Sequence, residues 1–159
     1  MTSFDKYLHA ILTRGSEHAR VDGSATIEAQ HLLLAIAAEA DPGTDRILAA
    51  AGLTEHGIRA ALDREFEHSL AAAGVSVADY ALPHPRPAAE RPQNMGASLK
   101  LALDRTFTTV RRSEVRPEHL LLGILRAEVG TVPRALTLAG IDLPDLRARI
   151  ERELSEHQV

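Results

Sequence analysis

The chain has 159 residues, of which 45% are hydrophobic and 25% charged, a composition typical of a folded globular protein. Its net charge of −4 argues against non-specific nucleic-acid binding, which needs a basic surface. There is no cysteine, which excludes disulfides, thiolate metal sites and a cysteine nucleophile. The sequence has no apolar signal core and no apolar run long enough to span a membrane, so we expect a cytoplasmic protein.

Four helices are expected in the first half of the chain, because apolar residues recur there at three- and four-residue spacing. Ser3 or Asp5 is suited to cap the first helix, and Gly15 within it suggests close packing against another helix. The second helix is apolar nearly all round, which is typical of a central, buried helix. Ile58, Leu62 and Phe66 share one face of the fourth. The expected helices span residues 4–18, 27–40, 44–51 and 54–72.

The segment 74–94 has a different character and is interpreted as a linker. Its first part, residues 75–82, alternates between apolar and polar residues like an extended segment. The following part contains four prolines, which disfavour regular helix and favour a polyproline-like coil. We expect the Pro-rich part to be mobile.

An internal repeat relates the two halves. Residues 30–36 read QHLLLAI, and residues 118–124 read EHLLLGI. Extending this match without a gap, residues 27–66 share 13 identities in 40 positions with residues 115–154. The second half accordingly repeats the helical pattern, with helices expected at 96–110, 117–128, 132–139 and 143–156.

These patterns predict an all-α fold of two four-helix repeats related by pseudo-two-fold symmetry. The whole chain, residues 1–159, is then a single domain, and we expect a monomer. Repeat 1 is assigned to residues 1–73, the Pro-rich linker to 74–94 and repeat 2 to 95–159.

The doubled motif and its flanks resemble the N-terminal domain of the Clp family of unfoldases. In that family the central motif reads Thr-Glu-His-Leu-Leu-Leu-Gly-Leu. The resemblance covers nearly the whole chain apart from the linker, and the ATPase phosphate loop of an unfoldase is absent from the sequence. The matching elements are the helix start at Phe4, Asp5 and Lys6, the two motifs at 29–36 and 117–124, and the unit of Arg46, Leu48, Ala51, Gly52 and Leu53.

The resemblance implies a binding module rather than an enzyme. In the family this domain receives substrates or adaptor proteins, binds phosphoarginine-tagged proteins in some members, and is the target of certain cyclic-peptide antibiotics. It implies a free-standing adaptor, or a decoy that competes with an unfoldase. It implies no cofactor and no catalytic residue, and a partner- or ligand-binding site at Phe4, Asp5, Lys6, Gln30, Gln93 and Glu118.

Three of these positions depart from the family pattern. The glutamates that contact the phosphoarginine guanidinium group correspond to Gln30 and Glu118, and an amide lacks the charge that strengthens such a hydrogen bond. The family often has threonine where this chain has Asp5 and Gln93, and Asp5 would repel a phosphate. We therefore expect the half containing Glu118 to be the better phosphoarginine site.

The sequence gives little indication of metal binding or catalysis. His31 and His119 adjoin buried leucines and have no carboxylate at metal-ligand spacing, so we expect them to bond neighbouring backbone rather than a metal. No motif pairs a serine, histidine and aspartate for nucleophilic catalysis.

The basic turn at Arg111, Arg112 and Arg116 is interpreted as a surface loop, with binding of an acidic partner as an alternative. The alternative function is a helical regulatory or DNA-associated docking module unrelated to Clp proteolysis.

Overall fold

The computed structural model describes residues 1–39, 41–76, 80 and 85–158, and within them all regular elements are helical. This confirms the predicted all-α class, and the expected helix positions agree with the structure to within about three residues. None of the helices in the described part is long and apolar enough to cross a membrane. The helices are α1 (Ser3–Val21), α2 (Ala29–Ala38), α3 (Pro42–Ala50), α4 (Glu55–Ala72), α6 (Ala97–Thr108), the short 3₁₀ helix η1 (Arg112–Glu114), α7 (Pro117–Leu125), α8 (Thr131–Leu138) and α9 (Leu143–Glu156).

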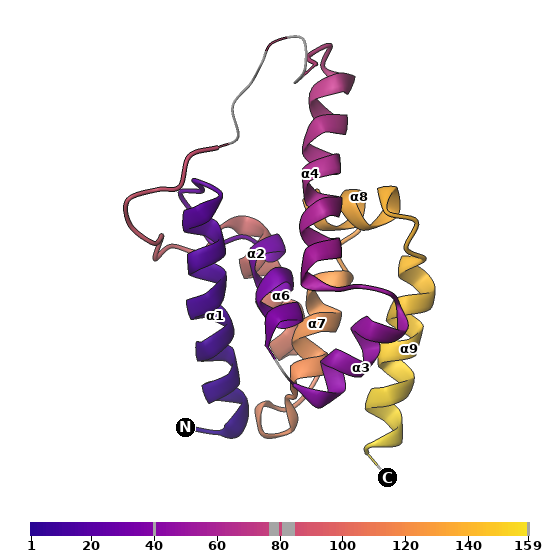
Figure 1. The fold of residues 1–159 in the computed structure, drawn as a ribbon. Helices are drawn as coiled ribbons and strands as arrows, with labels where there is room; N and C mark the ends of the chain where they lie inside the picture. Colours follow the sequence, from indigo (N-terminus) through magenta and orange to yellow (C-terminus); the bar gives the residue numbers. More distant parts are fainter. Residues whose placement is uncertain (40, 77–79, 81–84, 159) are drawn as a thin grey trace.

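Helices α2 and α7 occupy the centre of the bundle (Figure 1). They contact each other, and each also contacts helices of both halves. Both are buried on nearly every side, as the apolar run of each predicts. The core is therefore continuous across the two halves. The pseudo-two-fold relation between the halves and the boundaries of the repeats stay predictions.

Local signals in the sequence explain the helix ends. Thr2, rather than Ser3 or Asp5, is the N-cap of α1: its side chain accepts from the Asp5 N–H, and the Asp5 side chain accepts from the Thr2 N–H. The ends of α3 and α8 are each followed by a glycine with positive φ, Gly52 at 72° and Gly140 at 80°.

The close packing expected at Gly15 is confirmed, and of the three apolar residues expected on one face of α4, two are buried and Phe66 is not. A Cβ added to Gly15 would lie 2.9 Å from Leu32 Cδ1, so α1 and α2 meet at the glycine. Ile58 and Leu62 are buried, but Phe66 is 51% exposed. The distal end of α4 extends beyond the rest of the bundle (Figure 1).

The described end of the linker is attached to the first half rather than free of it. Ser16 Oγ donates to the Pro92 carbonyl at 2.7 Å, and the Ala88 N–H donates to the Arg20 carbonyl at 2.8 Å. Just beyond, an isolated parallel bridge joins Ile27 and Met95. Prolines along this stretch prevent helix formation, and polar groups of α1 bind the remaining backbone.

The extended conformation expected for residues 75–82 falls largely outside the described residues. Of those described, Tyr80 donates its N–H to the Ser76 carbonyl at 3.1 Å, a bond of helical rather than extended type.

Reciprocal ion pairs connect the two halves. Arg46 on α3 pairs with Glu153 on α9 at 2.8 Å, and Arg134 on α8 pairs with Glu65 on α4 at 3.0 Å. Arg46 and Arg134 are equivalent in the repeat, as are Glu65 and Glu153, so each arginine binds the glutamate of the other half. The pairs differ in environment, because the Glu65 side chain is 7% exposed and the Glu153 side chain 23%.

This difference predicts unequal effects of removing each arginine. Arg134→Met leaves the buried Glu65 carboxylate with the Ser69 hydroxyl as its remaining bond, and should lower the free energy of unfolding by about 1–3 kcal/mol. Arg46→Met, the matched control, leaves a better-hydrated Glu153 and should cost at most about 1 kcal/mol. Urea denaturation of both variants measures the difference, and equal losses would contradict it.

Candidate functional site

Glu118 is a buried carboxylate in the first turn of α7. Pro117 begins the helix, which brings Glu118 into the first turn, where the positive end of the helix dipole favours a negative charge. The residue is only 7% exposed. Its carboxylate binds one guanidinium group: Arg116 Nη2 lies 3.0 Å from Oε1 and Arg116 Nε lies 3.4 Å from Oε2. This two-point contact is the geometry in which carboxylates recognise arginine.

The first turn of α3 covers this carboxylate from the other half. Gly43 leaves the necessary space, because a Cβ at that position would collide with Glu118 Oε1. Asp41 caps the start of α3 by accepting from the Thr44 N–H at 3.1 Å. Glu118 is thus enclosed by helix starts of both halves, and a larger residue at Gly43 would displace it.

At the start of α1, the predicted residues Phe4, Asp5 and Lys6 have different environments. Phe4 is 6% exposed and belongs to the core, where its ring packs edge-on against Phe107 with centroids 6.0 Å apart. Asp5 pairs with Arg112 at 3.1 Å, and Lys6 is exposed. Hydrogen bonds from the Thr2 backbone and hydroxyl, followed by the charge of Arg112, hold the pKa of Asp5 below its usual value. Asp5 and Lys6 are therefore accessible at the start of α1, while Phe4 is covered.

Tyr7 connects α1 to the surroundings of Glu118. Burial raises the pKa of its hydroxyl, and the nearby carboxylates of Asp41, Glu39 and Glu118 add to the effect. The buried hydroxyl has no hydrogen-bond partner among the described residues. Helix α1 and the Glu118 carboxylate therefore lie within electrostatic reach of each other.

Gln30 and Gln93 lie elsewhere. Gln30 is half-buried in the first turn of α2 and lines a cavity of about 520 Å³ with Arg59 and Thr131. Gln93 is exposed and precedes Ala97, the first residue of α6, so it is not at a helix start as Asp5 is. The resemblance to the family matched Gln93 with Asp5 at the start of a helix, but α6 begins only at Ala97.

The two motif histidines have the structural role expected of them. The Glu28 N–H donates to His31 Nδ1 at 2.9 Å, and the Arg116 N–H donates to His119 Nδ1 at 3.0 Å, so each ring closes the start of its own helix. Because Nδ1 of His31 accepts, its Nε2 carries a proton, and this atom lies 3.2 Å from Asp22 Oδ2.

Asp22 and Arg59 complete this second polar group, which the sequence analysis did not identify. Arg59 Nη1 lies 2.7 Å from Asp22 Oδ1. Burial disfavours ionisation of Asp22, but the hydrogen bond from His31 and the charge of Arg59 outweigh it, so the pKa of Asp22 is lowered. The signal was available at Arg59, an identity of the repeat, but no motif joins it to Asp22.

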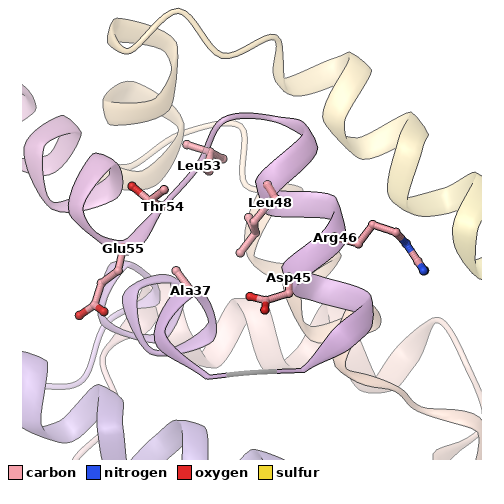
Figure 2. Close-up of a pocket in the computed structure, with 8 residues that line it drawn as sticks. Ala37, Asp45, Arg46, Leu48, Leu53, Thr54 and Glu55 are labelled. Carbon is pink, nitrogen blue, oxygen red and sulfur yellow. The ribbon is translucent and has the colours of Figure 1, made fainter.

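A second cavity of about 420 Å³ lies in the first half and is shown in Figure 2. Ala37, Leu48 and Leu53 form its apolar part, and Asp45 and Glu55 lie along it. The Arg46 side chain points away from it (Figure 2), in agreement with its ion pair to Glu153. None of the predicted site residues lines this cavity.

No cluster of three or more metal-ligating side chains occurs in the part of the chain that the structure describes. What the described residues bring together is a set of guanidinium–carboxylate contacts around α1, α3 and α7. The basic turn supplies two of them, through Arg112 and Arg116, which the sequence analysis interpreted as surface residues.

Comparisons with known proteins support the same fold. Residues 94–159 match the family model of the Clp repeat (R) N-terminal domain. Among 21 solved chains that match significantly is one from preliminary structural investigations of a malarial protein secretion system. It is 17% identical, with a TM-score of 0.58 over 92% of this chain and 90% of that chain, and at this identity the likeness shows the fold alone. A search of curated proteins gives no significant match.

The burial of His119 predicts a pH-dependent stability. Burial, followed by the charge of Arg116, lowers the pKa of His119 below its ordinary 6.5. The unfolded chain then binds more protons than the folded one between the two pKa values, so the free energy of unfolding should fall as pH drops through 6.5 toward the folded pKa. His119→Asn should reduce this slope in urea titrations across that range. The control is His56→Asn, at an exposed position whose side chain has no hydrogen bond among the described residues. Equal slopes in both variants would contradict the role of His119.

Proposed function

We propose that this chain, whose residues 94–159 match the family model of the Clp repeat (R) N-terminal domain, is a protein-interaction module that binds a guanidinium group of its partner at Glu118. One observation carries the proposal: the buried carboxylate of Glu118, which the resemblance places in the ligand site, already holds a guanidinium group, that of Arg116. An arginine or phosphoarginine side chain of a partner would replace Arg116 in this contact.

Exchange of one guanidinium for another is chemically reasonable. The Glu118 side chain is 9% exposed and that of Arg116 is 30%, so Arg116 can swing outward while the carboxylate stays in place. Replacement leaves no unpaired buried charge, which would otherwise be costly. In the free protein, Arg116 competes with the ligand and lowers its apparent affinity.

A phosphate on the partner's arginine would meet mixed charges at this face. Asp5 repels an anion, but its ion pair with Arg112 is exposed and weak, and Lys6 is exposed beside it. Arg112 can therefore turn from Asp5 to the phosphate, with the α1 start contributing favourable dipoles. We expect phosphoarginine to bind at the Glu118 half.

The Gln30 half is expected to contribute little to this recognition. Gln30 is neutral, and Arg59 near it is already bound to Asp22. A module with one charged site can act as an adaptor. It can also act as a decoy that binds an unfoldase's clients, or cyclic peptides, without processing them.

The test is isothermal titration calorimetry with phosphoarginine and with arginine as ligands. Glu118→Gln should weaken the binding of both at least about tenfold, because the charge-assisted contact is lost. Arg116→Ala should strengthen binding, because it removes the internal competitor.

Gln30→Ala is the control and should bind as the wild type does, with thermal unfolding confirming that each variant is folded. Unchanged affinity in Glu118→Gln would refute the assignment. Absence of binding in both the wild type and Arg116→Ala would refute guanidinium recognition at this site altogether.

A further inference from the structure

The distal half of α4 carries an apolar side chain, that of Phe66, that is not buried in the core. Phe66 is 51% exposed, whereas its equivalent in the second half, Leu154, is 8% exposed. The distal end of α4, beyond the residues that contact α8, extends past the rest of the bundle (Figure 1). A single exposed apolar side chain is ordinary, but one that adjoins other accessible apolar side chains forms an apolar surface of the kind that marks interaction sites.

A groove begins beside this ring. The cavity of about 520 Å³ that contains Gln30 is also lined by Phe66 and Leu62 from α4 and by Val21 from the end of α1. Val21 is 43% exposed. The volume is in the usual range for ligand sites, about 300–1,000 Å³. The groove is therefore partly lined by apolar side chains and is large enough for an aromatic or long aliphatic side chain.

The unpaired charges of this groove are negative. Asp22 is bound to Arg59 and His31, and Glu65 is bound to Arg134. Asp63 and Glu67 also line the groove, are exposed, and have no hydrogen bond or ion pair among the described residues.

Asp63 and Glu67 also repel each other. They are four residues apart on α4, so their carboxylates are neighbours on one helix face, where like charges destabilise the helix. A cation placed between the two carboxylates would attract both and offset their mutual repulsion.

We propose that this α4 groove is a docking site for a peptide segment of a partner protein in which a large apolar side chain is flanked by arginine or lysine. The apolar side chain packs against Phe66 and Leu62, and the flanking cation lies between Asp63 and Glu67. Acidic and phosphorylated segments, by contrast, are disfavoured by the same carboxylates. This docking site does not involve Glu118 and stands whether or not Glu118 binds a guanidinium group.

The test uses a short fluorescein-labelled peptide in which one phenylalanine is flanked by arginines in a Gly–Ser background, followed by fluorescence anisotropy. The full chain should bind it, and more weakly as salt rises, because the charges are exposed. Phe66→Ala should weaken binding at least about tenfold, as expected for a central aromatic contact. The double variant Asp63→Asn/Glu67→Gln should weaken binding and reduce the salt dependence.

Matched controls are Leu138→Ala, which removes another exposed apolar side chain, and Glu128→Gln, which removes another exposed charge. Both should bind as the wild type does, and circular dichroism verifies that all variants are folded. Failure of the wild type to bind overturns the proposal, as does equal binding by the Phe66 variant. Equal binding of a peptide with glutamates in place of its arginines also overturns it. A titration with phosphoarginine on the same variants separates this outcome from the result at Glu118.

Discussion

Burial of α2 and α7 against each other is the constraint on which the rest of the structure depends. Each helix is apolar on nearly all sides, so neither half can cover its own central helix without the other. A histidine bound to the N-cap backbone closes the start of each helix, which satisfies a polar group at the edge of the core. The outer helices then have only one side to bury, and their other sides are free for polar contacts.

Equivalent positions in the two halves differ in charge and exposure, so the two halves present different surfaces around the common core. Glu118 is a charged, buried carboxylate, while its equivalent Gln30 is a half-buried amide beside an open groove. Phe66 is exposed where Leu154 is covered. Binding is proposed at different features in the two halves: a guanidinium contact at the start of α7 and an apolar, acidic groove along α4.

The sequence predicted most of the helices because their signals are local: apolar spacing, prolines at helix starts, and glycines at helix ends. Contacts between residues that are distant in the sequence could not be predicted from such local signals. The repeat marked Arg46 and Glu153 as notable, but their pairing across 107 positions follows only from the tertiary arrangement that brings α3 and α9 near each other. Phe66 has the correct spacing for a core residue, and its exposure depends on where neighbouring helices end. The start of α6 was predicted to within one residue, but the resemblance still matched Gln93, which precedes this start, with Asp5.

A single core shared by both halves is best tested by native-state hydrogen exchange on the intact chain. Amides in α2 and α7 should exchange only through global unfolding, with equal opening free energies that match the urea-derived value. Exchange of α7 at a clearly lower free energy than α2, or the reverse, would show that one half opens by itself. That result would contradict the account of a continuous core on which both proposed binding surfaces are built.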